Sequence, residues 1–177
     1  IRPDIFAIGA SILALTWLLM RGIARGVSVA DRRWFILALV LYPLLASSAL
    51  AVYSRVLFSA HLALALALAI LPGSALGMGV SDAALAKVRG VLSKRRALAF
   101  ALSLVPALAL ACAYLIPALM RRLLESHPAN LGLDLAMIAC GALLVVLVRA
   151  EQKWAFGTGL AGIVLVLAVM ALSLIHI

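Results

Sequence analysis

The chain has 177 residues, of which 67% are hydrophobic and only 12% are charged. Soluble domains contain about 45–50% apolar residues, so this composition cannot form an ordinary water-exposed surface and excludes the soluble enzymes as a class. The formal charge is +9, but the basic residues stand in short clusters between apolar runs, as they do in the loops of polytopic membrane proteins. We therefore predict an all-α integral membrane protein with no nucleic-acid partner.

The apolar runs, taken in chain order, predict a bundle of six transmembrane helices. A bilayer core needs roughly 20 apolar residues in a helix, whereas the strands of a membrane barrel are short and alternate in polarity. The runs are apolar on every face, which favours helices. The predicted spans, which together form a single polytopic domain over residues 1–177, are residues 5–20, 34–53, 56–80, 97–120, 131–148 and 154–175.

The distribution of Lys and Arg predicts how the chain is oriented. The loops after the first, third and fifth predicted spans contain eleven of the 15 basic residues. Because the cytoplasmic side of a membrane protein carries the excess of Lys and Arg, these loops are predicted to lie inside and both termini outside. Trp34 and Trp154 then lie at the inner interface, where aromatic side chains anchor helices.

The loop between the third and fourth predicted spans has the pattern of a short amphipathic helix. Ser81 and Asp82 are residue types that begin helices, and Leu85, Val88 and Leu92 follow with helical spacing. The basic residues over 87–96 would face anionic headgroups, which predicts a helix lying on the cytoplasmic leaflet. A docking site for an acidic partner is the alternative.

Prolines and small residues interrupt the predicted spans. Pro72, Pro106 and Pro117 remove backbone donors that lipid cannot replace, so we expect kinks packed against neighbouring helices. Ser47 and Ser48 are expected to allow a close helix approach. Neither feature requires a ligand.

The predicted orientation places all three histidines on the outer side. Imidazole and thioether groups are suitable ligands for copper, but no two histidines have the spacing that puts both on one helical face. Hydrogen bonding at the interface is the alternative role for each of them, and Asp134 in the fifth span lies close enough to the outer interface to reach water. The possible metal ligands on this side are His61, His127, His176, Met120, Met137 and Cys112.

Several segments resemble one known family in the same order along the chain. The string SSALAVYSRVLFSAH over residues 47–61 resembles the outer-loop signature of the CtaG family of cytochrome c oxidase assembly factors. The resemblance is clearest over residues 1–80 and weaker over 97–148. Its other pieces are Arg2, Pro3 and Asp4; Arg33, Trp34 and Phe35; Pro72 with Leu76 and Gly77; and residues 114–120.

The resemblance implies a multi-pass protein of the bacterial plasma membrane that helps deliver copper to a respiratory oxidase. It also implies a metal or cofactor ligand at His61, and some relatives carry a preceding copper-resistance domain of the CopD type. The family motif has a methionine after this histidine and a second histidine four residues on, but here these positions hold Leu62 and Ala65. The span after the outer loop also lacks the expected histidines, so most family metal ligands are absent.

Two hypotheses therefore remain, and neither gives the protein an enzymatic activity. In the first, the chain supports copper delivery or oxidase assembly, with copper bound by His61, His127, Met120 and Met137. In the second, it is a non-catalytic accessory subunit of a respiratory or photosynthetic complex, held by lipid and helix packing, with His61 as a possible axial ligand of a pigment or haem. A transporter is disfavoured because the centres of the spans carry no charged residue.

Overall fold

A computed structural model describes residue 14 and residues 29–54 and 57–175 of the chain. The first predicted span, over residues 5–20, and His176 lie outside these residues. The described part is helical throughout, which confirms the all-α prediction. Its elements are α2 (Val29–Ala46), α3 (Ala49–Tyr53), α4 (Phe58–Leu68), the π-helical segment η1 (Ala69–Gly73), α5 (Ser74–Met78), α6 (Asp82–Lys94), α7 (Arg96–Leu115), α8 (Pro117–Glu125), α9 (His127–Arg149) and α10 (Lys153–Ile175).

Four helices of the described part are long and apolar enough to cross a membrane. They correspond to the third to sixth predicted spans and cover Phe58–Met78, Arg96–Leu115, Pro128–Arg149 and Lys153–Met170. Leu108, Val164 and Leu165 are each about 60% exposed on them, as expected for side chains that face lipid. The structure thus has the helices of a multi-pass membrane protein, while six spans and two outer termini stay predictions.

The predicted second span is interrupted at Ser47 and Ser48. Helix α2 ends at Ala46, and the two hydroxyl groups donate hydrogen bonds to backbone carbonyls of the preceding turn, Ser47 to Pro43 at 2.6 Å and Ser48 to Leu45 at 2.7 Å. Ser48 also begins α3, where its hydroxyl accepts the Ala51 amide at 3.4 Å. Serine side chains that bond to nearby backbone compete with helix continuation, so the pair divides this segment in two.

The prolines act in three different ways. Pro72 lies in η1, a one-turn π-helical segment between α4 and α5, so the predicted irregularity in the third span is confirmed. Pro106 is buried inside α7, which continues through it. Pro117 occupies the first turn of α8, where a missing amide costs nothing. Helix α7 therefore ends at Leu115, before the predicted end of the fourth span at residue 120.

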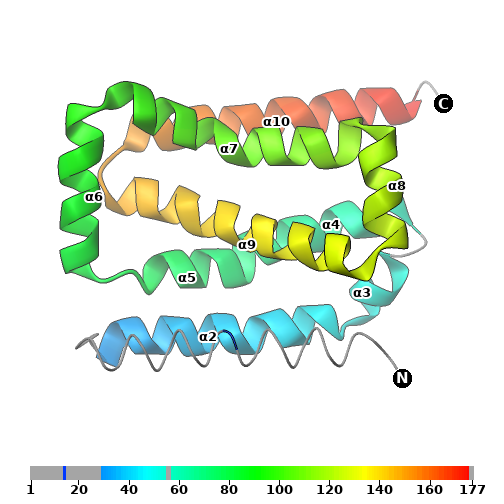
Figure 1. The fold of residues 1–177 in the computed structure, drawn as a ribbon, viewed down its shortest axis with the longest axis horizontal. Helices are drawn as coiled ribbons and strands as arrows, with labels where there is room; N and C mark the ends of the chain where they lie inside the picture. Colours follow the sequence, from blue (N-terminus) through cyan, green and yellow to red (C-terminus); the bar gives the residue numbers. More distant parts are fainter. Residues whose placement is uncertain (1–13, 15–28, 55–56, 176–177) are drawn as a thin grey trace.

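Two short helices lie across the ends of the bundle, roughly perpendicular to its long helices (Figure 1). Helix α6 is the predicted one: Ser81 accepts the Ala84 amide at 3.4 Å, and Leu85 and Leu92 are buried against the bundle. Helix α8 covers the opposite end, in a segment where we expected the start of a loop over residues 121–130. Its nine residues are too few for a hydropathy signal.

A close helix crossing joins η1 and α5 to α9. A Cβ atom on Gly141 would collide with the Ala69 carbonyl, and one on Gly73 would lie 2.7 Å from the Ile138 carbonyl oxygen. A Cβ on Gly77 would lie 2.6 Å from the Val145 side chain. Small residues allow helix backbones in a membrane to approach closely, so these glycines fix the position of α9 against the third span.

Candidate functional site

His61 is the buried imidazole of the described structure. It lies in the first turn of α4 and is only 4% exposed. Its Nε2 is buried without a hydrogen-bond partner, while the backbone of Ser54, which is also buried, hydrogen-bonds to the ring. A buried polar atom normally has a partner, so the free Nε2 is the feature of this region that most calls for a ligand.

The ring of Tyr114 packs against His61. The Tyr114 ring lies edge-on to the imidazole at a centroid separation of 5.6 Å, and its hydroxyl donates a 3.4 Å hydrogen bond to the His61 carbonyl. Phe58 packs edge-to-face on the same tyrosine, also at 5.6 Å. Tyr114 thus joins α7 to the part of α4 that carries the histidine, and Asp134 of α9 is near enough to Tyr114 for an electrostatic interaction.

The two predicted methionine ligands lie in the same part of the bundle. Met137 of α9 is 1% exposed and belongs to the apolar cluster that contains Tyr114 and Leu64. Met120 of α8 is partly buried and packs against this cluster. Both methionines thus belong to or border the extended apolar cluster that contains Tyr114, the partner of His61. We call His61, Tyr114, Met120 and Met137 the outer cluster, after the side of the membrane on which the predicted orientation places them.

The remaining candidates are less informative. His127 is the first residue of α9, but its side chain is outside the described part of the structure, as is all of His176. Cys112 and Cys140 are free thiols on α7 and α9. Among the described residues, no three His, Cys, Asp or Glu side chains lie together as a metal-binding group.

The donors of the outer cluster suit a soft metal ion. Thioether sulfur and imidazole nitrogen favour Cu(I), whereas the carboxylates preferred by harder ions are represented nearby only by Asp134. The partnerless Nε2 is available as a ligand in the neutral imidazole. The residues present thus fit Cu(I) in donor chemistry, with one imidazole where the resembled family has more.

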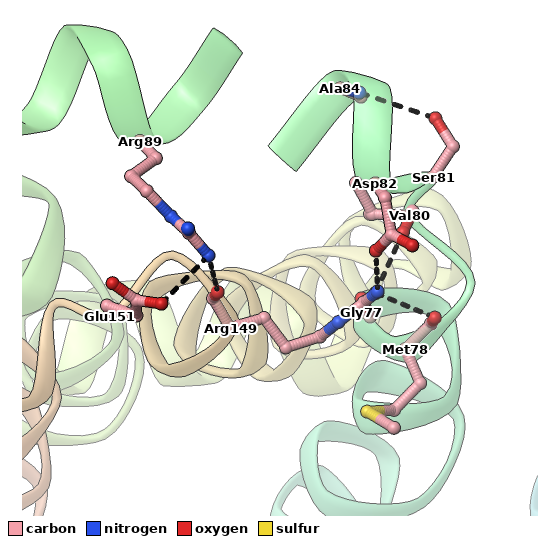
Figure 2. Close-up of polar contacts among 9 residues, drawn as sticks. All are labelled: Gly77, Met78, Val80, Ser81, Asp82, Ala84, Arg89, Arg149 and Glu151. Carbon is pink, nitrogen blue, oxygen red and sulfur yellow. Dashed lines mark hydrogen bonds and ion pairs between the residues drawn. The ribbon is translucent and has the colours of Figure 1, made fainter. Parts of the chain in front are cut away.

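A second polar cluster occupies the opposite end of the bundle and was not predicted. Arg149, the last residue of α9, donates hydrogen bonds to the carbonyls of Gly77 at 3.0 Å, Met78 at 2.8 Å and Val80 at 2.8 Å (Figure 2). It also pairs with Asp82 at 3.2 Å. The Asp82 side chain is 98% exposed, so water screens this ion pair and the three carbonyl bonds contribute most of the stabilisation.

The turn between α9 and α10 completes this end. Glu151 has a positive φ of 63°, and the amides of Glu151 and Gln152 bond to the carbonyls of Val148 and Leu147 at 2.9 Å each. This is the Schellman arrangement, in which glycine is the usual residue at the left-handed position. The Glu151 carboxylate pairs with Arg89 of α6 at 3.2 Å, and Arg89 also donates to the Arg149 carbonyl at 3.3 Å (Figure 2).

We call the group formed by Arg149, Asp82, Arg89 and Glu151 the latch. The sequence indicates this group only weakly. Arg149 is the first charged residue after a long apolar run, and Asp82 and Glu151 are acidic residues in basic loops predicted to share one side of the membrane. Opposite charges on one side suggest pairing, but the carbonyl partners depend on where α5 ends in space. That position is not encoded locally.

The described residues have the helices of a multi-pass membrane protein, and His61 is buried among them. Searches of known protein families, of curated proteins and of solved structures found no match for the chain.

Proposed function

We propose that this protein is a multi-pass protein of the bacterial plasma membrane that assists copper delivery to, or assembly of, a respiratory oxidase. Copper is then a cargo rather than a resident cofactor, and the protein acts by binding rather than by catalysis. The observation that carries the proposal is the buried, partnerless Nε2 of His61 beside Tyr114. The resemblance of residues 47–61 to the CtaG signature supports it.

The surroundings of His61 suit a transfer site. Met137 and Met120 supply thioethers that hold Cu(I) without a charge, and the apolar cluster around them keeps water away from the ion. One imidazole and neutral sulfur ligands form a weaker site than a closed set of imidazoles or thiolates. A carrier needs such a site, because its cargo must leave for the next protein.

Cu(I) competition with a chromogenic chelator, performed on the purified protein in detergent, tests the proposal. Wild type is expected to withdraw Cu(I) from the chelator in a saturable way, and His61→Ala to lose most of that capacity. Met78→Leu is the matched control, because Met78 is an exposed methionine at the far end of the bundle. Circular dichroism and thermal unfolding establish that each variant is folded.

Equal Cu(I) capacity of wild type and folded His61→Ala would contradict the proposal. Purification of associated complexes separates the two hypotheses, because an assembly factor dissociates from the mature oxidase. Stoichiometric retention in a respiratory or photosynthetic complex would instead identify the chain as an accessory subunit.

A further inference from the structure

A polar cleft opens beside the latch, between the start of α7 and the start of α10. Its volume is about 560 Å³, and Ser93, Arg96, Glu151, Gln152 and Trp154 line it. These residues come from the end of α6, the first residue of α7, the turn after α9 and the start of α10. The cleft is separate from the outer cluster and plays no part in the copper proposal.

The cleft carries an unbalanced positive charge. Arg96 has neither a hydrogen bond nor an ion pair within residues 29–54 and 57–175. The acidic residue of the cleft, Glu151, is already paired with Arg89 at 3.2 Å. Lys94 and Lys153, which are next in sequence to the lining residues Ser93 and Trp154, are exposed. An anion is therefore the complementary ligand, and Arg96 is the free cation that meets it.

The donor groups suit a phosphate. The Arg96 guanidinium presents a planar set of N–H donors that matches phosphate oxygens. Gln152 contributes a side-chain amide whose present hydrogen bond, to the Ala150 carbonyl, is long at 3.5 Å. Trp154 is 45% exposed and adds an indole N–H. Three donors of different types thus line one opening.

The surroundings of the cleft select a lipid rather than a free ion. Helices α7 and α10 both begin here and are two of the helices that are able to cross a membrane, so the cleft lies at the level of the headgroups. Leu98 and Phe100 on α7 are 38% and 46% exposed, and Leu160 on α10 is 46% exposed. Both helices that border the cleft thus expose apolar side chains near their starts, as helices in contact with acyl chains do.

We propose that this cleft binds the headgroup phosphate of an anionic phospholipid, with Arg96 as the principal contact. Basic pockets between membrane helices hold anionic lipid headgroups in this way. The lipid would pack its headgroup between α6 and the turn after α9. A bound lipid would therefore stabilise the packing of α6 against the turn after α9, which the latch also stabilises.

Native mass spectrometry of the full chain in detergent tests the site, with phosphatidylglycerol and phosphatidylcholine of identical acyl chains as probes. Wild type is expected to retain phosphatidylglycerol in preference to phosphatidylcholine. Arg96→Gln should weaken phosphatidylglycerol binding roughly tenfold, the usual effect of losing one charged hydrogen bond. Arg122→Gln makes the same charge change at the other end of the bundle, on exposed α8, and should leave the preference intact.

Two further measurements distinguish a bound lipid from a bound phosphate ion and rank the donors of the cleft. Gln152→Ala, checked by thermal unfolding, should weaken binding less than Arg96→Gln while the fold persists. Millimolar inorganic phosphate should not displace the lipid; displacement would assign the cleft to free phosphate and overturn the lipid assignment. Equal phosphatidylglycerol retention by wild type and Arg96→Gln would overturn the site altogether.

Discussion

The two ends of the bundle treat buried polar groups in opposite ways. At the latch, the Arg149 guanidinium donates hydrogen bonds to three carbonyls where α5 ends. In the outer cluster, the Nε2 of His61 is more deeply buried than the Arg149 side chain, which is 22% exposed, and it has no partner. A satisfied network fixes one geometry, whereas an unsatisfied donor or acceptor costs free energy that a ligand can recover. This difference indicates a structural role for the latch and supports the proposal that the outer cluster binds a ligand.

The crossing between α9 and the third span fixes the positions of these two ends relative to each other. Disrupting this crossing should therefore have the largest effect on the free energy of unfolding. Gly141→Ala places a Cβ atom against the Ala69 carbonyl and is expected to destabilise the protein by about 3 kcal/mol or more, or to prevent folding, because a backbone carbonyl cannot move aside as a flexible side chain can. Gly132→Ala on the same helix meets nothing within 4 Å and should be neutral or stabilising by up to about 1 kcal/mol. Unfolding in mixed micelles measures both, and equal stabilities would contradict the crossing.

Removing the latch should have the next largest effect. Arg149→Met keeps the apolar stem but loses every hydrogen bond, and we expect a loss of about 2–3 kcal/mol in unfolding free energy. Arg149→Lys should recover only part of this, because an ammonium group cannot reproduce the planar fork. Lys153→Met, an exposed neighbour, is the charge-matched control and should change stability little. A loss no greater than that of the control would show that the latch is dispensable.

A third substitution separates binding from stability in the outer cluster. Met137→Leu conserves volume at a site that is 1% exposed, so its cost in unfolding free energy should be below about 1.5 kcal/mol. Cu(I) affinity should nevertheless fall, because leucine has no sulfur. Chelator competition and thermal unfolding measure the two quantities on the same sample. Unchanged Cu(I) affinity would remove Met137 from the proposed ligands.

The smallest expected change in unfolding free energy concerns Glu151, the latch residue with a left-handed backbone conformation. Glu151→Gly relieves a conformation that costs other residues about 1–2 kcal/mol, but it loses the exposed pair with Arg89, worth less than about 1 kcal/mol. The net change should be close to zero or slightly stabilising. Glu151→Ala loses the pair and keeps the strain, so it should be less stable than Glu151→Gly. The reverse order in thermal unfolding would contradict the assigned turn geometry.

The sequence predicted the long helices well because an apolar run of sufficient length leaves few alternatives in lipid. Its errors arose where local polar chemistry divides such a run: the Ser47 and Ser48 hydroxyls end α2, and Pro117 starts α8. A hydropathy profile shows neither the helix break at the two serines nor the helix start at Pro117. The α6 helix, by contrast, was predicted because its cap and apolar spacing are both local.

The candidate site was predictable only in part. Residue type and the expected orientation placed His61, Met120 and Met137 in one outer region, and the structure packs both methionines on the cluster that contains Tyr114, the partner of His61. The free state of Nε2 and the contact with Tyr114 depend on α4 meeting α7, which no sequence spacing encodes. The role of Arg149 was missed for the same reason, since its carbonyl partners lie about 70 residues away in the chain.

X-ray absorption spectroscopy at the copper edge tests the central claim most directly. If His61 and the two methionines are the ligands as proposed, the protein loaded with Cu(I) should show one imidazole together with sulfur ligands. His61→Gln, folded and treated identically, should lose the imidazole signal. An identical spectrum for the two proteins, or a site without imidazole in wild type, would contradict the assignment of binding to the outer cluster.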